Sequence, residues 1–206
     1  STLCSTREID EILRWAEEDE LLQKQVEAIR EAYSLNNPHT VKVASVFLES
    51  FLFYTGFFAP LKLASEGRLT NTADIIRLIM RDEGVHGFYI GHKFQRGLPN
   101  LDDNDKAIIN GFLHHLYATE LLRCQEIYDE VGWTEDVKKY LRYNANKALA
   151  NLGMEPMFDA VHTEIPAYIM SALDISGSET FDFFSGSGAN YVIGKRVDTD
   201  DGDWDW

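Results

Sequence analysis

Apolar residues recur at helical spacing along almost the whole chain up to about Leu173, and no segment of more than a few residues alternates like a strand. This pattern predicts six helices. They cover about residues 6–34, 40–65, 71 or 72 to 95, 105–131, 134–152 and 166–173. Long helices that can pack antiparallel, without a repeat of solenoid period, predict an all-α helical bundle.

Polar, glycine and proline residues mark the predicted helix boundaries. Thr6 can cap the first helix, and the Asn36-Asn37-Pro38 cluster ends it. Glu66-Gly67 is a good signal for the end of the second helix. Because Gly56 and Pro60 lie inside that second helix, we expect a kink or local distortion there.

The last residues of the chain differ in kind from the rest. Residues 176–206 contain Ser-Gly repeats and an acidic run, so they cannot bury enough apolar surface to order themselves alone. The sequence therefore predicts a helical domain over residues 1–175 and a flexible acidic tail over 176–206. The aromatic residues Tyr191, Trp204 and Trp206 favour a docking peptide. The alternative is a tail that only keeps the protein in solution.

The net charge of the chain limits the kinds of binding partner that we expect. The 206 residues, which suggest one domain, carry a formal net charge of −15. That charge argues against nucleic acid or an anionic membrane surface as the main partner. The most apolar stretch, residues 41–63, is interrupted by Glu49, Pro60 and Lys62, so no membrane-spanning helix is expected. We expect no signal peptide, and we expect the two cysteines to be free thiols in a reducing cytoplasm.

Glu83 and His86 form a Glu-x-x-His pair inside the third predicted helix. Residues three apart on a helix share a face, so one helix can offer an oxygen and a nitrogen ligand to the same metal ion. Most such pairs in proteins are solvated helix faces. Here the helix is apolar around the pair, and a Glu and a His in such surroundings need partners.

Glu49 is the expected companion of this pair. It is the one acidic residue in the middle of an apolar run, residues 46–54. It is either a buried carboxylate hydrogen-bonded to a serine or tyrosine, or a metal ligand. The sequence predicts that the second and third helices bring Glu49, Glu83 and His86 to a common centre.

Three ligands make half of a dinuclear carboxylate site, which needs a second Glu-x-x-His and a second lone carboxylate. Asp159 and His162 have the spacing but lie between two prolines, where we expect a loop or a short helical turn. Glu120 has no histidine three residues later, and His114 and His115 have no acidic residue three before them. We therefore expect the other half to lie outside this chain.

Several stretches together resemble the small, radical-generating subunit of class I ribonucleotide reductases, most closely the class Ib branch. The matching stretches are residues 41–60 around Glu49, 81–86 around Glu83 and His86, 143–149, 184–188, Tyr191, and the acidic-aromatic end. The resemblance implies a ferritin-like bundle, normally a homodimer, in the cytoplasm. It also implies that Glu49, Glu83 and His86 bind one ion of a dinuclear manganese or iron centre.

The resemblance assigns roles to five further residues. Phe53, Phe57 and Ile79 match apolar residues that shield a tyrosyl radical in the family. Asp82 matches a carboxylate that hydrogen-bonds a histidine ligand from the other half of the site. Tyr191 matches a tail tyrosine that relays the radical to the large subunit. Ordinary core packing would make the first three residues apolar too.

The implied reaction is the reduction of ribonucleoside diphosphates to deoxyribonucleotides. In the family, the metal pair oxidises a tyrosine, and the radical passes to the large subunit, on which the tail docks. Class Ib members receive help from a flavodoxin-like activase. The opening residues, 1–4, resemble the family sequence just after the radical tyrosine. The expectation is therefore a partial chain, inactive and with little or no dinuclear centre without the missing N-terminal segment.

Four alternatives remain open at this point. The chain is a natural split product that needs its missing segment, or the C-terminal part of a full-length enzyme. It is otherwise a non-catalytic fragment or interaction protein that binds the large subunit through its tail. The fourth alternative, a ferritin-like oxidase of another kind, is disfavoured by the tail that carries Tyr191.

Overall fold

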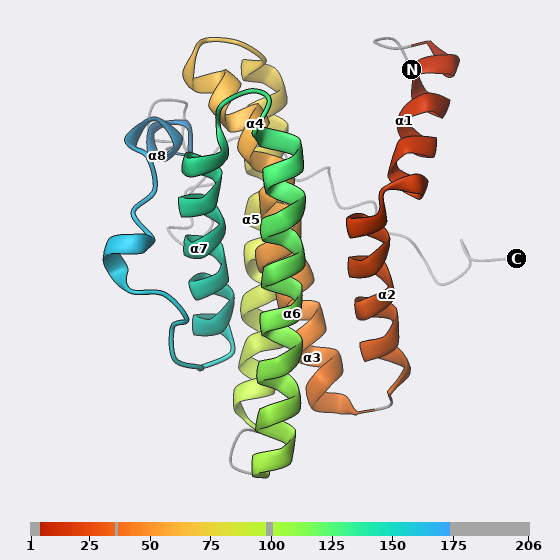
Figure 1. Ribbon diagram of the computed structural model, residues 1–206. Helices are drawn as coiled ribbons and strands as arrows, with labels where there is room; N and C mark the ends of the chain where they lie inside the picture. The colour runs from red at the N-terminus through yellow and green to blue at the C-terminus, as the bar shows by residue number, and fades with distance from the viewer. Residues whose placement is uncertain (1–4, 36, 98–100, 174–206) are drawn as a thin grey trace, which may run out of the picture. The chain divides into compact units, whose positions relative to one another are not determined.

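The structure is a computed structural model that describes residues 5–35, 37–97 and 101–173. The predicted all-α fold is confirmed, since these residues form helices and no strand (Figure 1). The helices are α1 (Thr6–Glu18), α2 (Glu20–Ser34), α3 (Pro38–Phe47), α4 (Phe53–Ser65), α5 (Thr70–Gln95), α6 (Asp103–Tyr128), α7 (Thr134–Asn151) and α8 (Ala167–Leu173), with a π-helical turn η1 (Leu48–Leu52) and a 3₁₀ turn η3 (Ala160–His162). The predicted tail, with Tyr191, lies outside the described residues.

The first predicted helix is two helices that meet at Asp19. The Asp19 carboxylate accepts a hydrogen bond from the Leu22 backbone N–H at 2.7 Å, so it caps α2 and ends α1. Ser5, rather than Thr6, caps α1 in a reciprocal capping box with Glu8. The Asp19 side chain, which accepts a hydrogen bond from a backbone N–H group, therefore divides a segment that periodicity alone predicts as one helix.

The second predicted helix is one apolar rod that contains an irregular turn. Asn37 caps α3 through the His39 and Thr40 N–H groups. The chain then passes through the π-helical turn η1 into α4, and Pro60 lies inside α4 without ending it. The irregular turn lies at Glu49, before Gly56 and Pro60, and a kink at those two residues stays a prediction.

This central rod supplies much of the hydrophobic core. Phe47, Phe51 and Phe58 are fully buried. The Phe58 ring lies 5.7 Å from the ring of Tyr140 on α7, and the Phe47 and Phe51 rings are 5.4 Å apart. Such aromatic pairs add to the stabilisation from burial. The rod packs against α5 and α7, so η1 is held between two long helices.

Two glycines let α5 approach its neighbours closely. A Cβ atom on Gly87 would lie 2.0 Å from the Ser50 hydroxyl of η1. A Cβ atom on Gly91 would lie 2.1 Å from the Asn151 carbonyl oxygen at the end of α7. These contacts fix α5 against η1, which places Glu83 and His86 opposite Glu49.

Residues 38–65 are long and apolar enough to cross a membrane by length and composition alone. Half of the apolar window is buried inside the fold, against α5 and α7. The core helix of a folded domain meets the same criterion, so this feature is weak support for a membrane span.

Candidate metal site

Glu49 projects from the π-helical turn η1. A π turn is rare, and within α-helices it is found frequently at functional sites, because the extra residue changes where the following side chains point. Its neighbours Ser50 and Phe51 are buried, whereas the Glu49 side chain keeps 22% of its surface exposed. The turn therefore brings one carboxylate to the edge of the apolar rod, facing α5.

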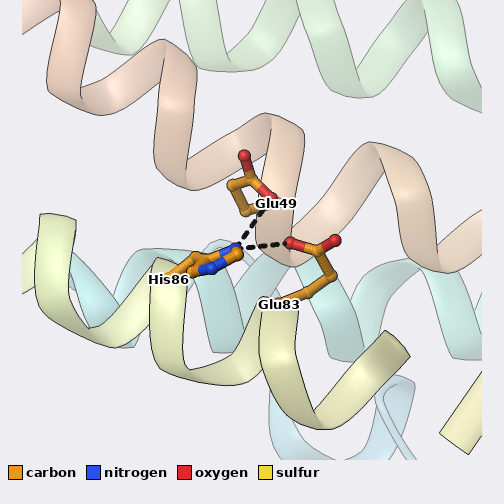
Figure 2. Close-up of side chains that lie close together, drawn as sticks. All are labelled: Glu49, Glu83 and His86. Atoms are coloured by element: carbon orange, nitrogen blue, oxygen red, sulfur yellow. Dashed lines mark hydrogen bonds and ion pairs between the residues drawn. The ribbon is translucent and has the colours of Figure 1, made fainter. Parts of the chain in front are cut away.

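Glu83 and His86 come from consecutive turns of α5 and face η1 (Figure 2). His86 Nδ1 lies 3.0 Å from Glu83 Oε2 and 3.7 Å from Glu49 Oε2. One ligand atom from each of the three residues lies within 4.8 Å of the others. The predicted convergence of the three side chains is thus observed.

Each of the three groups has a shifted pKa because the other two lie close to it. The pKa of Glu49 is raised to about 7, chiefly by burial and then by a hydrogen bond with Glu83 and by that residue's charge. The pKa of Glu83 is lowered, chiefly by the hydrogen bond with Glu49. The pKa of His86 is raised, chiefly by its hydrogen bond to Glu83. Carboxylates forced to share a proton are a setting in which a divalent cation can replace it.

The donor set fits a transition-metal ion. Two carboxylate oxygens and one imidazole nitrogen from adjacent elements suit manganese or iron, and the ligand types do not choose between the two. The described residues contain this group of three as a cluster with metal-ligand spacing. Three protein ligands leave room for further ligands on the same ion.

The surroundings of the cluster are more open than the sequence indicated. Six large apolar side chains of α5 are exposed, and we call the surface that they form the outer face of α5: Ile75, Leu78, Ile79, Val85, Phe88 and Tyr89. His86 lies on this face with 57% of its side chain exposed. Periodicity reports that a helix is apolar, but it does not report whether described residues cover each side.

The other predicted site residues differ in their exposure and contacts. Asp82 is exposed on the outer face, with a carboxylate oxygen 3.7 Å from Arg81 Nε. Phe53 is 40% exposed and lines a groove of about 300 Å³ between α2, η1 and α6. Phe57 packs against Tyr54, with ring centres 5.6 Å apart. Whether these residues shield a radical stays a prediction, as does the role of Tyr191.

The Asp159–His162 pair behaves as predicted. It lies on the 3₁₀ turn η3, both side chains are exposed, and the carboxylate and imidazole are 4.0 Å apart. It shares the spacing of Glu83 and His86, but within residues 5–35, 37–97 and 101–173 no second element offers it a further ligand. It therefore serves as an internal comparison for the candidate site.

Sequence reasoning missed the polar contacts that hold the site in place. Asn151 on α7 donates to the Ser50 hydroxyl at 3.2 Å, directly beside Glu49. The Tyr54 hydroxyl donates to the Met80 carbonyl at 3.1 Å and ties α4 to the helix of Glu83. These contacts join residues far apart in the sequence, so no local pattern could have revealed them.

The buried Glu120 was also missed as a structural residue. It is fully buried on α6 and accepts two hydrogen bonds from Arg123, at 2.8 and 2.9 Å, and one from Gln25 of α2. The Glu-x-x-Arg spacing was the available signal. The ion pair lies within α6, whereas the hydrogen bond from Gln25 joins α2 to α6, and neither takes part in the metal cluster.

Comparisons with known proteins identify the same family that the sequence resembles. A sequence model of the family described as "Ribonucleotide reductase, small chain" matches residues 1–166. The chain is 55% identical to ribonucleoside-diphosphate reductase subunit beta nrdF2 of Mycobacterium tuberculosis, over 100% of this chain and 65% of that protein. It is 48% identical to ribonucleoside-diphosphate reductase 2 subunit beta of Escherichia coli, over 66% of that protein. The chain thus spans just under two thirds of the length of these relatives.

A solved structure has the same fold. The dimanganese(II)-NrdF of Streptococcus sanguinis superposes with a TM-score of 0.78 at 45% sequence identity. The match covers 84% of this chain and 62% of that one. The described helices are therefore arranged as the corresponding helices are in that protein.

Proposed function

This chain belongs to the ribonucleotide reductase small-chain family, and from that premise we propose that it serves in the small subunit of a ribonucleoside-diphosphate reductase of class Ib. In this role it supplies a metal-generated tyrosyl radical to the large subunit for the reduction of ribonucleotides. One observation carries the proposal: Glu49, Glu83 and His86 converge from η1 and α5 with ligand atoms within 4.8 Å of one another.

In the proposed site these three residues hold one ion of a dinuclear manganese or iron centre. The manganese alternative is supported by the Streptococcus sanguinis relative, whose structure is described as dimanganese(II). When bound, the metal pair supplies the oxidising power that generates the tyrosyl radical. The chain's own part is to fix three donors on two helical elements that pack tightly through Gly87 and Ser50.

The neighbouring residues would protect and orient the centre. Phe53, Phe57 and Ile79 would keep water and reductants from the radical, and Asp82 would accept a hydrogen bond from a histidine ligand of the other half-site. Phe53, Ile79 and Asp82 are exposed among the described residues, so these roles need a further segment or chain that covers them. Tyr191 would relay the radical to the large subunit.

We propose the remaining roles from the sequence alone. Residues 1–175 would form the ferritin-like domain, and the acidic tail, 176–206, would dock on the large subunit. The subunit would be a cytoplasmic homodimer that accepts a flavodoxin-like activase and binds neither nucleic acid nor membranes.

Metal titration of the full chain tests the site. We expect Mn(II), followed by electron paramagnetic resonance (EPR) of the free ion, to bind with an affinity that His86→Ala lowers at least tenfold. His162→Ala is the matched control, because it removes an exposed histidine of the same spacing and leaves Glu49 and Glu83 untouched. Equal, weak binding by all three proteins would contradict the assignment.

A second experiment separates the enzyme from its alternative, a non-catalytic protein that uses only its tail. The full chain is supplied with the part of the Mycobacterium tuberculosis subunit that lies outside the matched 65%, together with metal and a class Ib large subunit. A tyrosyl signal and diphosphate reduction support the proposal. Binding to the large subunit that a peptide of residues 176–206 displaces, with no radical formed, supports the alternative.

A further inference from the structure

The short helix α8 is the last described element before residues 176–206, which we propose as the docking tail. A helix of seven residues is too short to be stable in water by itself. Its residues Ile169 and Ala172 are buried, and three polar contacts join it to three other helices, α4, α5 and α7. The fold therefore fixes the place at which the chain leaves the described helices.

Two of these contacts hold Tyr168, near the beginning of α8. The Tyr168 hydroxyl donates to the carboxylate of Asp136 on α7. The Lys62 ammonium group of α4 lies 4.3 Å from the centre of the Tyr168 ring, where the electrons of the ring attract a cation. Glu66 in turn holds this ammonium group at 2.7 Å. The first turn of α8 is thus fixed to α4 and α7.

The third contact holds the other end of α8. Arg77 Nε on α5 donates to the Ala172 carbonyl oxygen at 2.6 Å. The last four carbonyl groups of a helix have no partner inside it, and a cation is favoured beside them. Arg77 supplies both the donor and the charge, and its guanidinium also pairs with Asp74, three residues earlier on α5. The Arg77 side chain is only 18% exposed, so water competes little for this contact.

Arg77 lies on the same helix as two of the metal ligands. It precedes Glu83 by six residues, which is about 9 Å along the continuous helix α5. Tyr191, the proposed radical relay, follows Leu173 by 18 residues, which can span at most about 65 Å. If α8 came loose, its seven residues would add about 25 Å to that reach. The contact at Ala172 therefore limits how far Tyr191 can lie from the metal-bearing helix.

From these contacts we infer that Arg77 is a positioning residue for radical transfer. It holds the base of the tail beside α5, and so it keeps Tyr191 within reach of the metal-bearing helix. The inference rests on the proposed function, since it uses the tail and the radical of that proposal. It deepens that function because Arg77 belongs neither to the metal cluster nor to the tail.

Hydrogen exchange of the full 206-residue chain tests the contact itself. Arg77→Met keeps a long side chain but removes the donor, so the amide groups of α8 should exchange about tenfold faster, while those of α6 keep the parent's rates. Arg77→Lys keeps a cation and should restore much of the protection. Arg96→Met is the matched control, because Arg96 is an exposed arginine at the other end of α5, and it should leave α8 unchanged.

Turnover tests the positioning role. The chain is supplied with the part of the Mycobacterium tuberculosis subunit that lies outside the matched 65%, with metal and with a class Ib large subunit. In Arg77→Met the tyrosyl EPR signal should equal that of the parent. The deoxyribonucleotide formed per radical should fall about tenfold, because small misplacements of reacting groups slow a reaction strongly. A merely structural role would lower the radical content and the turnover together.

Tyr168→Phe loosens α8 independently and serves as the second variant if Arg77→Met does not fold. It removes the hydroxyl that donates to Asp136 but keeps the ring beside Lys62. It should also speed exchange in α8 and lower the turnover per radical.

The outcomes separate this inference from the proposed function. Parent rates of exchange in α8 of Arg77→Met, or parent turnover per radical in a variant whose α8 is loosened, overturn the inference and leave the proposed function standing. A fall in turnover that only follows the radical content overturns it as well. If the parent chain forms no radical under these conditions, the proposed function fails and the inference fails with it.

Discussion

His86 Nδ1 and Glu49 Oε2 lie 3.7 Å apart, one on α5 and the other on the π-helical turn of the preceding rod. This contact closes the triangle with Glu83 and joins two helical elements through two groups whose pKa values are both raised. Its consequence for the metal-free protein is a stability that depends on pH.

The metal-free chain should lose stability as the pH rises from about 5 to 8. The folded chain keeps the Glu49 proton up to a pH of about 7, whereas the unfolded chain releases it near 4.5. The folded state therefore binds more protons in this window, and its stability falls as they dissociate. The raised pKa of His86 acts in the same direction above its ordinary value of 6.5, whereas the lowered pKa of Glu83 matters only below 4.5.

Urea unfolding in the presence of a chelator measures this effect. The loss should be on the order of 1 kcal/mol once solvent screening of these partly exposed groups is allowed for. Glu49→Gln should flatten the dependence between pH 5 and 7, because it removes the titrating carboxyl. Glu126→Gln, on the exposed side of α6, should leave it unchanged. A wild-type stability that rises across this window would contradict the account.

The sequence predicted the three ligands of the site better than the structure around them. Helix geometry sets the spacing of Glu83 and His86, and a lone carboxylate within the apolar residues 46–54 indicates a ligand. All three ligands could therefore be predicted from short stretches of sequence. The π turn at Glu49 could not, because it depends on how the rod packs against α5 and α7. The openness of the outer face was missed because apolar composition alone cannot distinguish a packed surface from an exposed one.

The helices were predicted well where they end at clear signals, and less well where a single side-chain contact breaks them. Runs such as α5 and α7, with clear stop signals at Gly97 and Gly153, were predicted to within a few residues. The break at Asp19 was missed because it rests on a single side-chain hydrogen bond to Leu22. The contact of Ser50 with Asn151 joins residues far apart in the chain, which no local pattern encodes.

Gly91→Ala should destabilise the protein and loosen α5 from α7. The new Cβ would lie 2.1 Å from the Asn151 carbonyl oxygen, so a backbone segment has to move. Such overpacking costs about 1–3 kcal/mol. Thermal unfolding and Mn(II) affinity should both decline, since α5 carries two of the ligands.

Gly111→Ala is the control for this prediction. Gly111 lies in α6 with open space around it, so alanine should stabilise the helix by roughly 0.5–1 kcal/mol. If both variants shift the unfolding temperature equally, the close approach at Gly91 is not the cause.

Phe58→Ala should cost about 3–5 kcal/mol of unfolding free energy, because it empties a fully buried position between Tyr128 and Tyr140. Phe88→Ala removes the same group from a position that is 68% exposed. It should change the stability of the dilute, metal-free monomer by less than about 0.5 kcal/mol. Chemical unfolding of both variants checks the difference, and a comparable loss at Phe88 would mean that the outer face is covered in the monomer.

Glu120→Leu should be among the most destabilising single changes in the described part of the chain. It leaves the Arg123 guanidinium, whose side chain is only 14% exposed, without its two hydrogen bonds to a carboxylate. Breaking a buried ion pair in this way costs about 3–5 kcal/mol. The double variant Glu120→Leu/Arg123→Leu removes both charges, so it should recover much of the loss. Urea unfolding of the two single variants and the double variant gives the coupling energy, and additive losses would show that the two charges do not stabilise each other.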